Sequence, residues 1–519
     1  MNHSTVQYAI FLILILFSIE ATAAEWFVAP DGSDANPGTM KKPLATVMAA
    51  QALAGNGDTV YLRGGTYYLD NSHVSKILEP RAIVNYMTRD GIRYLAWPGE
   101  RPVFDFSNVK PSGHRVSAFW IEADDCVFKG FEIVGVQVVV TQAEAGNTQS
   151  TCFLINGGSR NRFENLSMHD GMGIGWYLID GADNLVLNCD AYNNKGLDAA
   201  SMGNVDGFGA HPRHTWGTGN VFRGCRAWFN SDDGFDLINA DAAVLIEHCW
   251  SFYNGFDQDF NRLVDGHGFK AGGYGRNGKL DFPVPPPRHE VRFCLAVRNK
   301  TSGFYANHHT GGLDWISNTA VRNPVNFNML STLLDNSTDV SGYDHYMRNN
   351  LGALGTIEVA NLNFEESDAG GNSFTLPVTV GEEDFASLDE ALLMLPRQPD
   401  GSLPEIAFAR LRAGSDLVDA GMETGFPFAG AAPDLGAFES CDEDLATLTG
   451  MELDPGRLEL HWRAPAGWPC RVLGSSSPAG PFETWETLLT GTFDDAGLLL
   501  FNHPGAADGG AFFCRLLLR

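Results

Sequence analysis

The chain has 519 residues, and its 63 acidic residues against 35 Lys and Arg give a formal net charge of −28 at pH 7. This charge excludes a protein that binds nucleic acid through a basic surface. Hydrophobic residues make up 44% of the chain and aromatic residues 11%, which is typical of a globular protein and not of a disordered or collagen-like one. The 58 glycines favour one long, turn-rich repetitive domain.

Residues 1–23 predict a secretory signal peptide. The apolar run Ala9–Phe17 is too short to span a bilayer, and Ala21-Thr22-Ala23 has the small-x-small pattern of a signal peptidase site. No later stretch is long and apolar enough to cross a membrane. We therefore expect a secreted protein, extracellular or periplasmic, with no membrane contact after cleavage.

A repeat runs through the middle of the chain. The segments FENLSMHD, LNCDAYNN, FRGCRAWFN, IEHCWSFYN, RFCLAVRN and WISNTAVRN resemble one another, and they end at Asp170, Asn194, Asn230, Asn254, Asn299 and Asn323. A base spacing of 24 residues, with longer steps that absorb loops, is typical of stacked coils. The units contain short β-prone stretches and have no room for a crossover helix. The sequence therefore predicts an all-β protein, a parallel β-helix over residues 24–440.

Two ladders are expected inside this solenoid. The Asn series is interpreted as a turn ladder in which each amide bonds the next coil. Five residues before its members lie Asn165, Cys189, Cys225, Cys249, Cys294 and Asn318. Small residues stacked at one interior position predict a core ladder, so these four cysteines are expected to be buried free thiols.

Both ends of a solenoid need a cover. Leu44, Val47, Met48 and Leu53 fit one face of a short N-terminal helix. Near the other end, Ser387 and Glu390 have capping-box spacing before a helix that Pro396 would stop.

Residues 441–519 are predicted to form a small separate β module, similar to a β-sandwich. Its alternating segments, such as LELHWRA, are short strands. Cys441, Cys470 and Cys514 are candidates for one disulfide, and the spacing leaves the pairing open.

A second repeat lies just beyond the Asn ladder, in five triplets that start with glycine. They are Gly175–Tyr177, Gly207–Gly209, Gly234–Asp236, Gly268–Lys270 and Gly303–Tyr305. The central aromatic of each triplet is expected to stack inside the helix. Since strand side chains alternate, the third residues should form an outward column: Tyr177, Gly209, Asp236, Lys270 and Tyr305.

Carboxylates gather around this column. Asp206 precedes one triplet, and Asp232 and Asp233 precede the next, so that with Asp236 four acidic residues lie on two adjoining coils. Each alone is more often a turn-capping residue. Together they would repel one another unless a cation neutralises them, and an all-oxygen set suits Ca²⁺. The pattern predicts a calcium site.

Lys270 is expected one rung from this site. A bound cation would disfavour its ammonium form and lower its pKa toward the range of a general base. A divalent cation beside a neutral amine suits β-elimination on a uronate, in which a base removes the C5 proton and the C4 glycosidic oxygen leaves.

The motifs NVDGFG, NSDDGFD and DGHGFKAGG, in this order, resemble those of family 9 polysaccharide lyases, the pectate lyases with a right-handed parallel β-helix. The opening VAPDGSDANPGT and the later HYMRNN and APDLGAFE are also similar, so the resemblance covers residues 26–439. It implies a calcium-dependent lyase acting on an acidic polysaccharide, most simply pectate. It also implies that calcium is bound by Asp206, Asp232, Asp233 and Asp236, and that Lys270 is the base.

The chain departs from that family after Gly303-Phe304. Members commonly carry an acidic or amide residue and an Asn-rich run there, whereas this chain has Tyr305, Asn307 and His308. These three residues are candidate substrate-binding residues, although ordinary outward positions of a coil would also account for them.

Two other functions remain open at this stage. A β-helix glycoside hydrolase could use Asp232 and Asp233 with Asp206 for acid and base work, but it leaves Lys270 without a role. A non-catalytic glycan-binding solenoid would account for the extra C-terminal module. In each case we expect a monomer.

Overall fold

The computed structural model describes residues 23–275, 280–440 and six strands beyond residue 446. The predicted signal peptide, apart from Ala23, lies outside the described residues. Among the described residues, no helix has the length and apolar character needed to cross a membrane.

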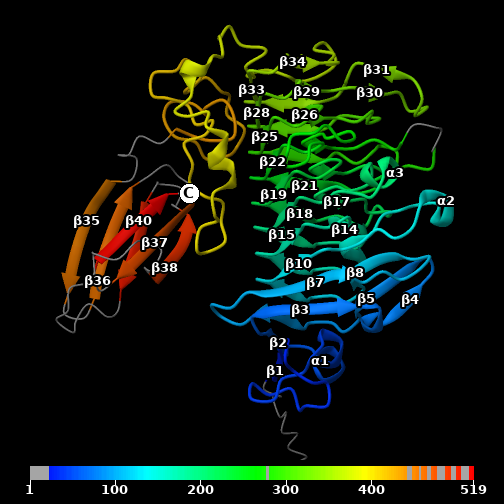
Figure 1. Ribbon diagram of the computed structural model, residues 1–519. Helices are drawn as coiled ribbons and strands as arrows, with labels where there is room; N and C mark the ends of the chain where they lie inside the picture. Colours follow the sequence, from blue (N-terminus) through cyan, green and yellow to red (C-terminus); the bar gives the residue numbers. More distant parts are fainter. Residues whose placement is uncertain are drawn as a thin grey trace, which may run out of the picture.

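Three long sheets wind around a common core and form a parallel β-helix (Figure 1). The first sheet contains β1 Glu25–Val28, β2 Thr59–Leu62, β6 Arg93–Ala96, β9 Val127–Lys129, β12 Arg162–Glu164, β15 Leu185–Leu187, β18 Asn220–Arg223, β21 Val244–Glu247, β24 Glu290–Arg292, β27 Asp314–Ile316 and β32 Tyr346–Arg348. The second contains β3 Gly65–Asp70, β7 Pro102–Asn108, β10 Glu132–Val134, β13 Ser167–His169, β16 Asp190–Tyr192, β19 Arg226–Trp228, β22 Trp250–Phe252, β25 Leu295–Val297, β28 Thr319–Val321 and β33 Leu351–Ala353.

The third sheet carries the predicted outward column. It contains β4 Lys76–Leu78, β5 Arg81–Met87, β8 Arg115–Ile121, β11 Thr151–Asn156, β14 Ile174–Asp180, β17 Phe208–Ala210, β20 Phe235–Asp236, β23 Phe269–Lys270, β26 Ser302–Tyr305, β29 Val325–Asn328 and β34 Ile357–Ala360. Its strands pair in parallel except for β4 with β5. The short hairpin β30 Ser331–Thr332 and β31 Asp339–Val340 lies outside the three sheets. The predicted parallel β-helix is confirmed.

The triplets stack in the expected register. Phe208, Phe235, Phe269 and Phe304 are paired on successive rungs, and their rings stack about the core with centroids 4.9–5.0 Å apart. The glycine before each ring is required by close packing: a Cβ on Gly234 would lie 2.0 Å from Ser251 Oγ. These contacts fix the direction in which the third residue of each triplet points.

The Asn ladder is present from Asn194 onward. The amide of each residue donates to the side-chain oxygen of the next, from Asn194 through Asn230, Asn254 and Asn299 to Asn323, at 3.0–3.2 Å. The cysteine column is also confirmed, because Cys189, Cys225, Cys249 and Cys294 are buried free thiols.

The first repeat is shifted by one residue from its predicted alignment. Ser167 pairs with Asp190. The residue one coil before Cys189 in the core ladder is therefore Leu166, and not Asn165 as predicted. Likewise Gly171, and not Asp170, bonds the amide oxygen of Asn194 through its backbone N–H. Asn165 and Asp170 instead occupy left-handed turn positions, with φ of 53° and 51°, which Asn and Asp tolerate better than most residues.

The N-terminal helix α1 spans Val47–Leu53, and the Thr46 side chain caps it. Val47 is buried against the first coils, but Leu53 is 48% exposed; its predicted place on the buried face is wrong because Ala50 and Gln51 occupy that face. The other short helices are η1 Asn71–His73, α2 Gln142–Ala145, α3 Ala199–Met202, η2 Glu382–Asp384 and η3 Glu390–Met394.

The helix predicted before Pro396 is a single 3₁₀ segment, η3. Its cap is Asp389, whose carboxylate accepts from the N–H of Ala391. Ser387 accepts from the N–H of Asp389 instead, so the predicted Ser387–Glu390 capping box is wrong. Glu390 uses its carboxylate to bind Arg322.

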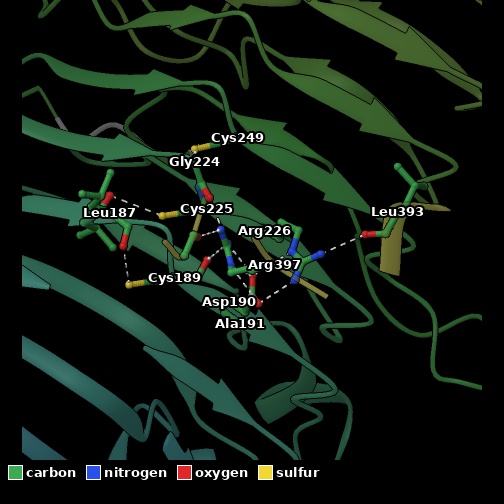
Figure 2. Close-up of polar contacts among 12 residues, drawn as sticks. Leu187, Cys189, Asp190, Ala191, Gly224, Cys225, Arg226, Cys249, Leu393 and Arg397 are labelled. Atoms are coloured by element: carbon green, nitrogen blue, oxygen red, sulfur yellow. Dashed lines mark hydrogen bonds and ion pairs between the residues drawn. The ribbon is translucent and has the colours of Figure 1, made fainter. Parts of the chain in front are cut away.

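The segment after β34 returns along the outer face of the second sheet (Figure 1). Phe385, Leu393 and Phe408 pack there against the outward apolar residues of β22 to β33. Figure 2 shows the polar anchor of this segment: Arg397 binds the Asp190 carboxylate at 2.6 Å and the carbonyls of Cys189 and Gly224 at 3.0 Å. The return segment therefore covers one flank of the β-helix.

Beyond residue 446 the chain forms two antiparallel sheets of three strands each. They are β35 Thr447–Asp454, β36 Arg457–Arg463 and β39 Leu498–His503, and β37 Pro469–Ser475, β38 Glu486–Thr492 and β40 Phe513–Leu518. Side chains of both sheets share one core, which includes Trp462 and Val472, as in a β-sandwich. Cys470 is a buried free thiol, while Cys441 and the Cys514 side chain lie outside the described residues.

Candidate active site

The site is built on the third sheet, where register brings distant residues together. Asp236 pairs with Lys270, and Lys270 pairs with Tyr305. Asp206 and Asp233 lie on the turns that enter β17 and β20, and the N–H of Asp233 donates to Asp206 Oδ1 at 3.1 Å. The predicted column is thus a row of adjacent side chains, and two turn carboxylates lie beside it.

Three carboxylates converge within this row. Oxygen atoms of Asp206, Asp233 and Asp236 lie within 4.8 Å of one another, and all three residues are buried. Asp232 is also buried, but it is not a member of this group. Its Oδ1 has no hydrogen-bond partner among the described residues.

Lys270 reaches into the same cluster. Its Nζ lies 3.0 Å from Asp233 Oδ2 and 3.1 Å from Asp236 Oδ2, and its side chain is 13% exposed. Burial disfavours the ammonium, but attraction to Asp233 and Asp236, and then to Asp232 and Asp206, outweighs it and raises the pKa of Lys270 well above its usual value. Without a cation, therefore, the pKa shift is opposite to the one expected beside calcium.

The carboxylates respond to one another as well. Burial raises the pKa of Asp206 well above its usual value, and the charges of Asp236 and Asp233 add to the shift. Burial and the charges of Asp233 and Asp206 raise the pKa of Asp232 in the same way. One lysine does not neutralise this many buried acids.

A hard cation fits these residues. Their donors are carboxylate oxygens, which suit Ca²⁺, and the unpartnered Oδ1 of Asp232 and the mutual repulsion of the acids would both be relieved by a positive ion. Asp206, Asp233 and Asp236 are the residues best placed to hold it.

The three residues predicted to bind substrate follow Lys270 along the sheet. The Tyr305 ring stacks on His267 at 4.4 Å. Asn307 is buried in a left-handed turn and donates to the carbonyl of Gly272 at 2.6 Å. His308 Nδ1 lies 2.7 Å from Asp339 Oδ1. All three lie near the base, and each already has a contact within the protein.

One neighbour of the site was not assigned by sequence. His211 Nδ1 and Tyr177 Oη share a hydrogen bond of 3.1 Å on the N-terminal side of the carboxylates. Burial lowers the pKa of His211 to about 4, so the imidazole is neutral. The register of β14 and β17 places Tyr177 beside Gly209, two residues before His211. That register is the signal from which this contact could have been predicted.

Comparisons with known proteins agree with this fold. Residues 26–350 match the family model described as "Pel9A-like, right handed beta helix region". Pectate lyase L of Dickeya chrysanthemi is 35% identical over 81% of this chain and 91% of its own length. A solved structure titled rhamnogalacturonan lyase is 44% identical over 75% of this chain and 97% of its own, with a TM-score of 0.72. That of pectate lyase Pel9A is 32% identical over 81% and 97%, with a TM-score of 0.64.

The fold and the relatives define a right-handed parallel β-helix protein of the lyase type. The chain belongs to the Pel9A-like right-handed β-helix family. The resemblance seen in the sequence is confirmed, and so is the enzyme class expected from it, a polysaccharide lyase.

Proposed function

We propose that this protein is a secreted, calcium-dependent lyase that cleaves a polyuronate by β-elimination, with Lys270 as the Brønsted base. The observation that carries the proposal is the position of the Lys270 amine, 3.0–3.1 Å from two of three clustered carboxylates. A glycoside hydrolase would give this amine no role in the chemistry.

Asp206, Asp233 and Asp236 would hold the calcium, and Asp232 stays a candidate ligand. When bound, calcium supplies a charge that holds the uronate carboxylate and acidifies the neighbouring C5 proton. Burial already opposes the ammonium form of Lys270. If a bound cation neutralised the acids, this opposition would no longer be outweighed, and a neutral amine would become accessible.

The neutral amine of Lys270 then removes the proton from C5. The electron pair of that bond forms the C4–C5 double bond, and the bond from C4 to the glycosidic oxygen breaks. The departing oxygen takes up a proton and becomes a hydroxyl, while the lysine returns its proton to solvent. The products are one chain with an unsaturated end and one with a free hydroxyl.

The relatives support two uronate substrates. Pectate is supported by the pectate lyases at 35% and 32% identity. Rhamnogalacturonan is the second candidate, because the structure with that name is 44% identical over 75% of this chain.

The substrate contacts on the C-terminal side of Lys270 remain part of this proposal. Tyr305 offers a ring at the next rung, and His308 and Asn307 follow it in the adjoining turn. We also propose that the protein is a monomer, which light scattering of the purified protein tests.

The first experiment incubates the purified protein with polygalacturonate and, separately, with rhamnogalacturonan, with calcium or with a chelator. Ultraviolet absorbance reports the unsaturated product. Calcium-dependent absorbance with either polymer supports the lyase and identifies its substrate. New reducing ends without absorbance would contradict it and favour a hydrolase, and binding without product would favour a glycan-binding solenoid.

A further inference from the structure

A cavity of about 360 Å³ lies on the third sheet, on the N-terminal side of the active site. Its lining includes Tyr177 and Trp120, which the strand register places two rungs apart on this sheet. Tyr177 is three rungs before Lys270, and β5 at the far end is six rungs before it. At ~4.8 Å per rung the cavity lies roughly 14 to 29 Å from the base.

Three arginines line this cavity: Arg81, Arg115 and Arg213. Arg81 is only 6% exposed, and its Nη1 donates to two neutral oxygens, Ser117 Oγ at 3.2 Å and the Gln149 carbonyl at 3.0 Å. The Nε of Arg115 is buried and has no hydrogen-bond partner within the described chain.

None of the three guanidinium groups forms an ion pair with a carboxylate of the described residues, and this distinguishes buried Arg81, beside half-buried Arg115 and exposed Arg213, from other arginines inside the protein. Arg226 and Arg397, for example, both bind Asp190. Burial and the nearby charge of Arg115 lower the pKa of Arg81 to about 9. A buried cation needs an anionic partner. Buried Arg81, with half-buried Arg115 and exposed Arg213 around the same cavity, is therefore arranged to meet an anion that the protein does not itself supply.

The rest of the cavity is suited to a sugar. Trp120 and Tyr177 line it as large, nearly buried aromatic side chains, and burial raises the pKa of Tyr177 to about 12, so its hydroxyl stays neutral. Asn156 adds an amide. The acidic side chain in the lining, Glu79, is mostly exposed and lies 3.2 Å from His114.

We propose that this arginine pocket binds the carboxylate of a uronate residue in the polysaccharide, several sugar units from the bond that is cleaved. This inference rests on the proposed polyuronate lyase function. The pocket and Lys270 lie along one face of the third sheet, so one extended polysaccharide chain could reach both. Planar guanidinium groups match carboxylates in geometry and charge. The pocket thus selects long acidic chains.

The test uses Arg115→Gln, Arg213→Gln and the double variant, with Arg93→Gln as the matched control. Arg93 is exposed on β6 of the first sheet, away from this face. Calorimetry in chelator measures the binding of a trimer and an octamer of galacturonate, and of rhamnogalacturonan oligomers of similar length. Losing one charge-assisted hydrogen bond should weaken octamer binding by about tenfold or more, and the weakening should be smaller for the trimer.

Activity is then measured on polymers, where we expect the KM to rise by a similar factor. The proposed role of the pocket would be overturned if the double variant bound the octamer as tightly as the wild-type protein does. Equal weakening for trimer and octamer would also overturn it. Failure of the wild-type protein to bind any uronate oligomer would also overturn it. The lyase function fails separately, if wild-type and Arg93→Gln proteins bind the oligomers but release no unsaturated product.

Discussion

Lys270 and Asp236 are register partners on adjacent strands, β23 and β20, and their charged atoms lie 3.1 Å apart. Their separation is set by parallel backbone pairing and by the stacked rings of Phe235 and Phe269 beside them. The candidate base and a candidate metal ligand are therefore positioned by the core of the β-helix, and flexible loops are not needed to bring them together.

Replacing the base should abolish turnover. Lys270→Ala is expected to lower kcat by about 10²- to 10⁴-fold, since a general base typically contributes that much. Product absorbance on the preferred polymer measures it, and calcium affinity should remain measurable. Lys129→Ala is the control, because Lys129 is half exposed on the first sheet and pairs with Glu164. Retained turnover in Lys270→Ala would refute its role.

Removing a central carboxylate should weaken calcium binding. Asp233→Asn is expected to lower calcium affinity by at least about tenfold, which calorimetry detects. Added calcium should raise the Tm of the wild-type protein, because a ligand that binds only the folded state stabilises it, and the variant should lose most of that rise. Asp170→Asn, outside the cluster, is the control. An equal rise in both proteins would place the ion elsewhere.

The pH dependence of stability should reveal the repulsion among the acids. Since the pKa of Asp206 is raised in the folded protein, the unfolded chain loses this proton first, and the Asp206 contribution to stability falls as pH rises above about 4. In chelator, Asp206→Asn lacks this loss, so its Tm relative to wild type should increase between pH 4 and pH 7. A constant difference would argue against the raised pKa.

Interrupting the Asn ladder should destabilise the whole solenoid. The buried Asn254 amide bonds Asn230, Asn299 and the Ala227 carbonyl. Asn254→Ala leaves these groups without partners and should lower the free energy of unfolding by about 3 kcal/mol. Chemical denaturation measures it, against Asn108→Ala at an exposed strand end. A change below 1 kcal/mol, as for a typical surface site, would contradict the ladder's role.

The return segment should depend on its anchor. Arg397→Ala removes one of the two arginines at buried Asp190 and is expected to cost about 3 kcal/mol. Arg160→Ala breaks a half-exposed surface pair and should cost below about 1 kcal/mol. Limited proteolysis should cut the return segment faster in Arg397→Ala alone; equal rates would show that apolar packing suffices.

The sequence predicted those features that repeat. The register of Phe208, Phe235 and Phe269 followed from their triplets because equivalent coil positions carry the same residue types. The alignment was wrong by one residue at Asn165 and Asp170. These residues resemble the ladder residues in type, but they occupy the left-handed turn positions just before the ladder positions. Local capping rules likewise misplaced the start of η3, since Asp389 competes with Ser387 for the same role.

The parts without a repeat were not predictable. Arg81, Arg115 and Arg213 come from different coils, share no motif, and meet only because β5 and β8 lie side by side and the turn after β17 reaches them. The pKa direction at Lys270 was equally inaccessible, because it depends on how closely four acids approach one amine.

The Arg397–Asp190 contact joins positions 207 residues apart, and this has a consequence for synthesis. Coils can stack one upon another as the chain emerges, because each rung needs only its predecessor. The flank of the second sheet, however, stays bare until the return segment has been made. A nascent or truncated chain ending near β34 would therefore expose an apolar strip on this flank, and its protection from aggregation depends on the return segment, which is translated after the coils that it covers.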